Sequence, residues 1–546
     1  MYVLEQISSE VSSELKQLSP LQAPAIAWEK GNNLADLSTA FAFQAAKIYQ
    51  KSPVAIAQFL AKKLSERTNW LTFLPHERGF LNCNWQPEGI YQVLKQASEM
   101  GPEYGKRPKE PERKANIEFC SANPTGPIHL GNARGAAIGS VLANLLETLG
   151  WQVTREYYFD DYGTQVDAFV LSLEARYFQA LGKPCQFPEN GYQGQYVRDI
   201  ANEVVQLQGR AILNKDSASR LAFFREYGLG KMLEQHRKTT SRLGIDYDAW
   251  FSQSSLDRDG WLVKVMQALE KRGVLFRKDG AVWFRSTQFG DDKDRVVIRS
   301  NGEPTYLAWD MAYHLNKRAR GAKLLIDVWG PDHHGYVPRV KAFFQALGYE
   351  EADLQLLIYQ MVHLFDKGAE VSMSRRSGDF VTLDEVLDAV GKDATLFLLV
   401  DRSLDSNMDF DLDLARQNSL SNPVYYVQYA YTRALALERE AAVREIEIPP
   451  PDPELCRIYT SSERKLVTMI AMMPEEILRA ALTFSPMRIA NYAKDLAGQF
   501  HAFYHDERVL GANPPYQAAR LVLVRAVRIV LANTLAILGL SAPEHM

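Results

Sequence analysis

Cysteine is scarce in this chain of 546 residues. Its four cysteines, Cys83, Cys120, Cys185 and Cys456, lie far apart and form no Cys-x-x-Cys pair. This spacing argues against a disulfide framework and against a cysteine-rich zinc site, and it fits a reducing compartment. We therefore expect a cytoplasmic protein.

Long apolar runs and a strong charge of one sign are also missing. The N-terminus carries acidic residues and no apolar run, so it does not resemble a secretory signal. The most apolar late segment, 521–540, is interrupted by Arg525 and Arg528, which predicts a buried helix and no membrane association. A net charge of −4 neither indicates nor excludes a nucleic-acid partner.

A chain of this length is expected to form two to four domains. Residues 101–114 are rich in Pro, Gly and charge and are typical of a linker, so a first domain is expected at 1–110. Residues 111–410 alternate strands and helices, which predicts a doubly wound parallel α/β sheet of the Rossmann-like kind. A charged, mostly helical insertion is expected at 165–290. Strand signals then stop, and 411–546 is expected to be all helical.

The expected elements follow from hydrophobic periodicity and run length. Sheet strands are predicted at 116–120, 151–159, 324–329 and 356–359. A helix is predicted at 133–149, a hairpin at 282–285 and 295–299, and late helices at 423–440, 462–473, 487–505 and 517–540.

The segment 121–135, Ser-Ala-Asn-Pro-Thr-Gly-Pro-Ile-His-Leu-Gly-Asn-Ala-Arg-Gly, is the most informative stretch. It joins an expected strand to an expected helix, an arrangement that presents backbone N–H groups to phosphate. His129 and Asn132 are three residues apart and can point the same way, and Gly131 lets a ligand approach closely. A nucleotide site is predicted, although a lone histidine at a helix start is usually a cap or a core residue.

Two further polar segments fit such a site. Residues 371–379, Val-Ser-Met-Ser-Arg-Arg-Ser-Gly-Asp, could neutralise a departing pyrophosphate, although a solvated basic loop is the commoner role of an Arg-Arg pair. Residues 329–336, Trp-Gly-Pro-Asp-His-His-Gly-Tyr, follow a predicted central strand, where ligands bind in open α/β sheets. Adjacent residues rarely chelate one ion, so ribose and adenine recognition is predicted there and no metal site is expected.

A scatter of acids and hydroxyls completes the candidates: Glu118, Asp160, Asp161, Tyr306 and Asp310. Glu118 lies in an otherwise apolar strand, and a buried carboxylate requires a cationic partner. An internal ion pair and a cationic ligand both satisfy that requirement, and the pattern leaves the two readings open.

In their order along the chain, the segments 121–135 and 371–379 resemble the class I aminoacyl-tRNA synthetases, with their His-Ile-Gly-His and Lys-Met-Ser-Lys-Ser signatures. Within that class, Ser-x-Asn-Pro-Thr-Gly-Pro-x-His-x-Gly, Tyr-x-x-Asp-x-Gly and Trp-Gly-x-Asp-His-His-Gly-Tyr are similar to the arginyl-tRNA synthetase family. The segments 422–430 and 542–544 resemble the helical anticodon-binding domain of that family. The segments 36–40 and 79–82 resemble its N-terminal additional domain.

The resemblance implies ATP-dependent activation of L-arginine to arginyl-adenylate, followed by transfer to the terminal ribose of tRNA(Arg). ATP enters as a substrate with Mg²⁺, and no tightly bound metal or organic cofactor is expected. A monomer is the family expectation. The alternatives are another class I synthetase, a nucleotidyltransferase with the same turn, and a tRNA-binding paralogue without catalysis.

The resemblance also implies roles for individual residues. Catalysis is assigned to His129, Asn132 and Arg375. ATP is expected against Pro127, His129, Gly131, Asn132, Gly330, Asp332, His333, Met373, Ser374 and Arg375. Arginine is expected against Glu118, Ser121, Asn123, His129, Tyr306 and Asp310.

The chain departs from the two signatures at defined places. Asn132 replaces the second histidine, Ser372 replaces the first lysine, and Arg375 stands at the later lysine. Lys114 and Arg376 are candidate substitute cations, although a solvated linker lysine is the favoured reading of Lys114. tRNA phosphate contacts are expected among Arg433, Arg520, Arg525 and Arg528. Tyr425, Tyr426, Tyr429 and Tyr431 are candidates for base stacking, and core packing is expected for at least half of them.

Overall fold

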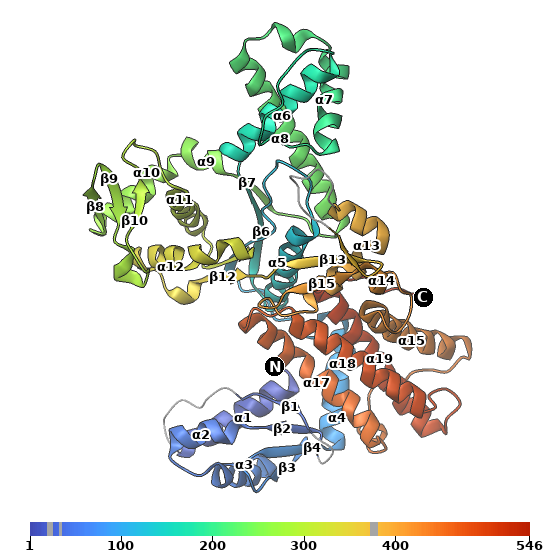
Figure 1. The fold of residues 1–546 in the computed structure, drawn as a ribbon. Coiled ribbons are helices and arrows are strands. Elements are labelled where there is room, and N and C mark those ends of the chain that lie inside the picture. The colour runs from blue at the N-terminus through green and yellow to red at the C-terminus, as the bar shows by residue number, and fades with distance from the viewer. Residues whose placement is uncertain (19–25, 32–34, 372–380) are drawn as a thin grey trace. The chain divides into compact units, whose positions relative to one another are not determined.

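The chain folds into two compact units, which are described separately below. The computed structural model describes residues 1–18, 26–31, 35–371 and 381–546 (Figure 1). Unit 1 combines Met1–Pro108 with Asn418–Met546, and unit 2 is Lys109–Gln417.

The core of unit 2 is a five-stranded parallel sheet in the order β12-β11-β5-β6-β7. Its strands are β5 (Lys114–Glu118), β6 (Gln152–Phe159), β7 (Ala249–Ser252), β11 (Leu324–Trp329) and β12 (Leu354–Ile358). The order places the first strand of the sheet at its centre, with crossovers to both sides, so the predicted doubly wound α/β fold is confirmed. Strand β7 was not predicted, because its four residues lie inside the segment expected as a helical insertion.

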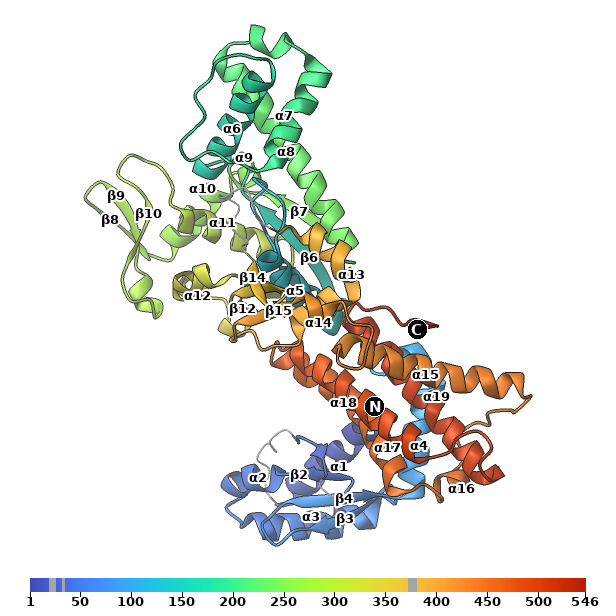
Figure 2. The ribbon, with the colours of Figure 1, turned by 45° about the vertical axis from the view of Figure 1, so that its right-hand side comes forward.

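Helices cover both faces of this sheet (Figures 1 and 2). Helix α5 (Leu130–Thr148) packs on the face that carries Phe119. The contact requires glycine, since a Cβ at Gly139 would come within 2.1 Å of the Phe119 ring. Helix α11 (Tyr306–Ala319) covers the opposite face, which carries Glu118. The two helices that begin with candidate site residues are therefore held on opposite faces of one central strand.

The remaining elements of unit 2 surround the sheet. A helical subdomain has its own core around Phe169, Tyr177 and Phe224 and comprises α6 (Thr164–Ala180), α7 (Gln195–Gln208) and α8 (Ser217–Arg242). The predicted hairpin is confirmed in the antiparallel sheet β10-β9-β8. The other bounds are α9 (Gln253–Arg258), α10 (Trp261–Lys271), β8 (Leu275–Lys278), β9 (Ala281–Phe284), β10 (Arg295–Ile298), α12 (Val337–Ala346), β13 (Val362–Asp366), β14 (Ala369–Val371), α13 (Leu383–Val400), β15 (Met408–Asp411) and α14 (Leu412–Ala415).

Unit 1 joins an antiparallel sheet, in the order β1-β2-β4-β3, to a helical bundle. Its N-terminal elements are α1 (Val3–Leu18), β1 (Glu29–Lys30), β2 (Leu37–Thr39), α2 (Phe41–Tyr49), α3 (Pro53–Arg67), β3 (Leu71–Pro75), β4 (Leu81–Trp85) and α4 (Pro87–Met100). Its C-terminal helices are α15 (Pro423–Val443), α16 (Pro453–Cys456), α17 (Ser461–Leu482), α18 (Met487–Asp506) and α19 (Pro514–Ile537). The all-helical prediction for this part of the chain is confirmed.

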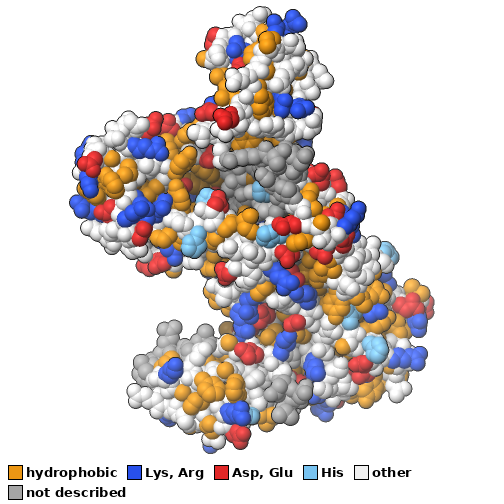
Figure 3. Space-filling view, viewed as in Figure 1, with side chains coloured by type: hydrophobic (Ala, Val, Ile, Leu, Met, Phe, Trp, Pro, Cys, Tyr) orange, Lys and Arg blue, Asp and Glu red, His pale blue; other side chains and the backbone are white. Residues whose placement is uncertain are grey.

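The two sequence segments of unit 1 share one core. The indole of Trp85 donates to the Thr468 hydroxyl over 2.9 Å, and the Tyr104 hydroxyl donates to the Ile470 carbonyl over 3.1 Å. Within the described residues, no helix is long and apolar enough to cross a membrane. On the face shown in Figure 3, positive and negative side chains are interspersed, so on this face local clusters of cations are the candidates for attracting a polyanion.

Candidate active site

The candidate site lies at the carboxyl edge of the parallel sheet. The chain leaves β5 through Cys120 and Ser121, whose φ angles of 69° and 39° fall in the left-handed region that favours glycine. Backbone strain of this kind is concentrated at functional sites. The Ser121 hydroxyl accepts from the Tyr158 N–H over 3.1 Å, and this bond ties the turn to the neighbouring strand β6.

His129 is the N-cap of α5. Its Nδ1 accepts a hydrogen bond from the Asn132 N–H over 3.3 Å, so the proton of a neutral imidazole lies on Nε2. The capping role predicted for this histidine is confirmed. Capping uses the acceptor Nδ1, so it is compatible with a phosphate role, which would use the donor Nε2–H. The residues His129, Gly131 and Asn132 are partly exposed, whereas Pro127 is buried.

The structure joins the first motif to Thr382 and Leu383, which follow the second motif in the sequence. His129 forms an isolated antiparallel bridge with Thr382, and the Leu383 N–H donates to the Ile128 carbonyl over 2.9 Å. Thr382 also caps α13 in a capping box with Glu385. Met373, Ser374 and Arg375 lie outside the described residues, and so does Arg376. Strand β14 ends immediately before that segment, and Thr382, which bridges to His129, follows shortly after it.

The third motif follows β11 as a 3₁₀ turn, Pro331–Tyr336. Asp332 and His333 are exposed, and the rings of Trp329 and His333 lie 5.6 Å apart. Gly330 is tightly placed, since a Cβ there would come within 2.8 Å of Asp332 Oδ1. Within the described residues, no group of three or more His, Cys, Asp or Glu side chains could hold a metal ion.

Glu118 has an internal cationic partner. Its Oε2 accepts from Lys317 Nζ over 2.7 Å, and the carboxylate is only 5% exposed. Burial raises the pKa of Glu118, and the ammonium of Lys317 opposes that shift. The ion pair supports the internal reading of Glu118, and it also holds the carboxylate at the edge where a substrate would bind.

Two other acids at this edge are held in an electrostatically unfavourable state. Burial raises the pKa of Asp310 to about 7, and repulsion from Glu118 and Asp160 adds to the shift. Burial likewise raises the pKa of Asp160 to about 6, with repulsion from Asp161 and Glu118. Acids in this state favour a cationic ligand, because a positive charge relieves both desolvation and repulsion.

The remaining candidates for amino-acid binding lie near these acids. Tyr306 stands one helical turn before Asp310 on α11 and is 58% exposed. The Asn123 side chain donates to Gln165 Oε1 over 3.0 Å. Asp161, by contrast, accepts from the Ser254 N–H over 2.9 Å and from the Ser252 hydroxyl over 2.6 Å, which makes it a structural acid.

Lys114 is in the wrong place to substitute for the missing signature lysine. It is the exposed first residue of β5, whereas His129 follows the carboxyl end of that strand. Four residues of extended strand separate Lys114 from Glu118 by roughly 13 Å. This cation therefore lies at the opposite edge of the sheet, in agreement with the favoured reading of a solvated lysine.

Three models of known protein families match successive parts of the chain. A model described as tRNA synthetases class I (R), catalytic domain, matches residues 92–420. A model described as arginyl tRNA synthetase N terminal domain matches residues 5–84. The chain belongs to the arginyl-tRNA synthetase family. A DALR anticodon binding domain model also matches residues 427–546, and membership of the family makes the chain an aminoacyl-tRNA ligase.

Individual relatives cover nearly the full chain. An arginine–tRNA ligase of Desulfitobacterium hafniense (strain DSM 10664 / DCB-2) is 44% identical over 514 residues, which are 94% of this chain and 92% of the relative. That of Bacillus subtilis (strain 168) is 40% identical over 557 residues, covering 100% of both chains. The solved Thermus thermophilus arginyl-tRNA synthetase has a TM-score of 0.80 at 23% identity, covering 99% of this chain and 100% of that chain, and it supports the fold alone.

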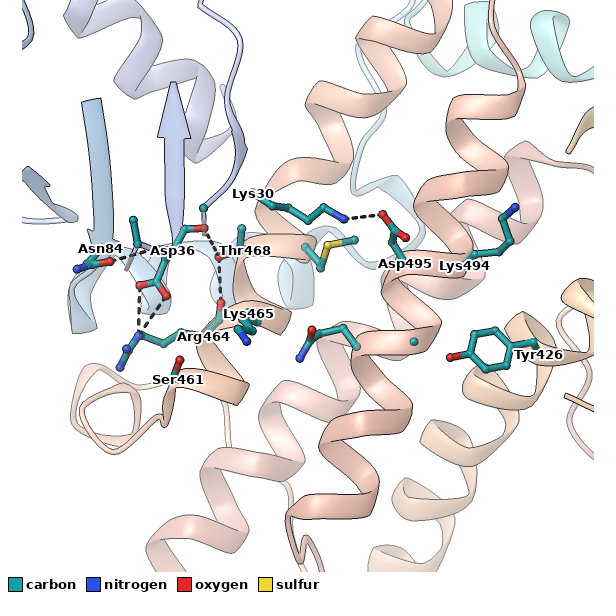
Figure 4. Close-up of a pocket in the computed structure, with 15 residues that line it drawn as sticks. Lys30, Asp36, Asn84, Tyr426, Ser461, Arg464, Lys465, Thr468, Lys494 and Asp495 are labelled. Atoms are coloured by element: carbon teal, nitrogen blue, oxygen red, sulfur yellow. Dashed lines mark hydrogen bonds and ion pairs between the residues drawn. The ribbon is translucent and has the colours of Figure 1, made fainter. Parts of the chain in front are cut away.

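Unit 1 contains a second polar site that the sequence did not reveal. A cavity of about 750 Å³ opens between β1, β2, β4 and helices α15, α17 and α18. Its cations are Lys30, Arg464, Lys465 and Lys494. Figure 4 shows Lys30 reaching toward Asp495, and Arg464 facing Asp36 at 3.2 Å, so part of this positive charge is balanced. These residues are scattered over 465 positions of sequence, and no local pattern could bring them together.

Of the four arginines considered for tRNA phosphate contacts, three lie beside carboxylates and one lies over tyrosine rings. Arg520 is 7% exposed and pairs with Glu463 at 2.7 Å and with Glu507, so its charge is balanced within the bundle and it is the weakest candidate of the four for a phosphate contact. Arg528 pairs with Glu438 at 2.6 Å, and Arg525 lies 3.8 Å from the same carboxylate. Arg433 stacks 4.5 Å from the ring centres of Tyr429 and Tyr504.

The four tyrosines considered for base stacking differ in burial and in their contacts. Tyr431 is buried, as the core-packing alternative expected. The rings of Tyr425 and Tyr429 stack on each other with centres 5.8 Å apart, and Tyr426 lines the unit 1 cavity.

Proposed function

We propose that this chain is an arginine–tRNA ligase whose chemistry takes place at the carboxyl edge of the unit 2 sheet. The arginine carboxylate attacks the α-phosphorus of ATP, the bond to pyrophosphate breaks, and arginyl-adenylate forms. The terminal ribose hydroxyl of tRNA(Arg) then attacks the activated carbonyl, and AMP leaves. Mg²⁺ enters with ATP as part of the substrate. Neither step needs a covalent nucleophile from the protein, so positioning and charge stabilisation supply the catalysis.

The phosphate half of the site is assigned to the start of α5. His129 Nε2–H, the first N–H groups of the helix and the Asn132 amide are donors for the triphosphate. The bridge between His129 and Thr382 supports this assignment, because Thr382 follows the second signature segment closely in the sequence. Arg375, with Met373 and Ser374, is proposed to complete the phosphate site. Pro127 and Gly131 shape its wall, and Gly330, Asp332 and His333 are assigned to the adenosine.

The arginine half is assigned to the acids. The observation that carries this assignment is the raised pKa of Asp310 and Asp160 beside a third carboxylate, Glu118. Arginine brings an α-ammonium and a guanidinium, and these positive charges would relieve the repulsion among the acids that remains beside the Lys317 ion pair. Glu118, Asp310 and Tyr306 are proposed to bind the side chain, and Ser121 and Asn123 the amino-acid backbone. Uncharged citrulline should be rejected strongly, because it would leave the acids unpaired.

tRNA is proposed to contact unit 1 through the cation-lined cavity. Lys465 is exposed, and Lys465 and Lys494 lie on neighbouring helices at the cavity wall (Figure 4). Two lysines at such a cavity can neutralise backbone phosphates while Tyr426 offers an aromatic face. The interspersed charge elsewhere on the visible face favours this local cluster over a broad basic surface.

We further propose that the protein acts in the cytoplasm as a monomer. None of its four cysteines, which all lie in the described part of the chain, forms a disulfide, and this supports a reducing compartment. Sedimentation of the purified protein with and without tRNA tests the monomer.

The proposed activity is tested by charging total tRNA with each of the twenty amino acids in turn. Charging with arginine, dependent on ATP and accompanied by release of AMP and pyrophosphate, is the expected result. Charging with lysine, glutamine or cysteine and not with arginine would contradict the assignment of the substrate. Binding of tRNA without any charging would indicate the non-catalytic alternative.

A further inference from the structure

Three buried carboxylates lie side by side across the centre of the parallel sheet. In the strand register, Asp327 of β11 pairs with Glu118 of β5, and Glu118 pairs with Glu156 of β6. The exposed fraction of these residues is 0% for Asp327, 5% for Glu118 and 0% for Glu156. Adjacent residues in register share one face of a sheet, so the three acids form a continuous row beneath helix α11.

Helix α11 supplies the counter-charges of this row. Lys317 Nζ lies 2.7 Å from Glu118 Oε2 and 2.6 Å from Asp327 Oδ1. His314 Nε2 lies 2.7 Å from Asp327 Oδ2, and Arg320 pairs with Glu156. Among the described contacts of α11, Lys317 is thus the single side chain that donates hydrogen bonds to carboxylates of two strands. One is Glu118 of β5, which is proposed to bind substrate arginine, and the other is Asp327 of β11.

Lys317 cannot act on substrate directly. Its side chain is 0% exposed, and its ammonium lies 4.1 Å from the centre of the Tyr313 ring. Stability alone is a weak explanation for such a group, because buried ion pairs rarely stabilise a fold more than apolar residues of similar volume. A functional explanation is available, since α11 also carries Asp310, two helical turns before Lys317.

We propose that Lys317 is a positioning residue that holds Glu118 as an oriented carboxylate for the guanidinium of substrate arginine, and so sets the preference for arginine over uncharged analogues. This inference rests on the proposed function, in which Glu118 binds the arginine side chain. Lys317 donates to Oε2, which restrains the orientation of the carboxylate and leaves Oε1 as the acceptor for the ligand in this proposal. Without Lys317, the repulsion between Glu118 and Asp327 favours protonation of one of them.

The test compares Lys317→Met with Lys317→Arg in steady-state aminoacylation by the full-length protein with tRNA. Lys317→Met should raise the KM for arginine by at least about tenfold, with the KM values for ATP and tRNA within about twofold of wild type. The ratio of the citrulline inhibition constant to the arginine KM should fall by a similar factor. Lys317→Arg keeps the charge and can donate to both Glu118 and Asp327, so it should recover most of the arginine affinity.

A second variant keeps the test decisive if Lys317→Met does not fold. Lys317→Met combined with Asp327→Asn removes one charge of each sign, and the Asn can still hydrogen-bond to His314. A folded double variant with the same defect in the KM for arginine supports the proposal. A wild-type KM for arginine in either folded variant would overturn it, and so would an equal rise in the KM for ATP. A wild-type protein that charges no arginine would instead overturn the proposed function.

Discussion

Arg134 and Gln360 are joined by a 2.7 Å hydrogen bond from guanidinium to backbone carbonyl across 226 residues of sequence. The same guanidinium donates to the carbonyls of Ser403 and Ser406 at 2.8 Å each, and the side chain is completely buried. Burial lowers the pKa of Arg134. This residue therefore fastens α5, which begins at the capping His129, to the segments that precede β13 and β15.

Arg134→Met is expected to destabilise unit 2, because it leaves several buried carbonyls without a donor. The expected loss is about 3 kcal/mol, and Arg134→Lys should lose less because one ammonium can satisfy some of the carbonyls. Urea unfolding followed by tryptophan fluorescence measures both values. An Arg134→Met protein as stable as wild type would show that the carbonyls find other donors.

Local sequence patterns predicted most strands and helices of unit 2, but they did not predict which charged side chains pair with one another. The α5 start was predictable because Gly131 and the Pro-rich turn stand between an apolar strand and an apolar helix. β7 was missed because its four residues are too short for alternation to distinguish them from the helices around them. The partner of Glu118 was missed because Lys317 is 199 residues away. The sequence could not single out Arg520 among the four candidate arginines, because Glu463 and Glu507 meet it only in the folded bundle.

The KM for arginine is expected to rise as the pH falls below 7. The pKa of Asp310 is raised to about 7, so its carboxyl group becomes neutral below that pH and no longer attracts the substrate cation. The rise should approach about tenfold per pH unit, and Asp310→Asn should remove it above pH 6. Initial rates at saturating ATP between pH 6 and 8.5 test this. An identical pH profile in Asp310→Asn would exclude Asp310 from the substrate site.

The same residue is expected to make the unliganded protein less stable at higher pH. The folded-state pKa of Asp310, about 7, exceeds its ordinary value of 3.8, so the folded state binds more protons between those values. Stability contributed by the protonated group is therefore lost as the pH rises toward 7. Asp310→Asn should stabilise the unliganded protein at pH 8 by about 1–3 kcal/mol, with little effect at pH 4.5. Thermal unfolding at pH 8 and at pH 4.5 tests this expectation. An Asp310→Asn protein that is less stable than wild type at pH 8 would contradict it.

His129 is expected to serve as both cap and catalyst, and two substitutions separate these roles. His129→Ala removes both, whereas His129→Asn keeps a side-chain acceptor for the Asn132 N–H and loses the Nε2–H donor. Both should lower the rate of adenylate formation by roughly 10²–10³, and only the alanine variant should lose about 1 kcal/mol of stability. Pre-steady-state formation of arginyl-adenylate in the presence of tRNA measures the chemical step. Full activity in His129→Asn would restrict His129 to capping.

Lys465 is expected to contribute to tRNA binding without supporting the fold of unit 1. It is exposed at the cavity wall, whereas its neighbour Arg464 pairs with Asp36 at 3.2 Å and so has a structural role. Lys465→Glu should raise the KM for tRNA by about three- to tenfold and lower the salt dependence of binding by about one unit of slope. Lys271→Glu, an exposed change at the end of α10 in unit 2, is the matched control. Equal tRNA affinity in the two variants would remove the cavity from the tRNA surface, since any effect of net charge alone is common to both.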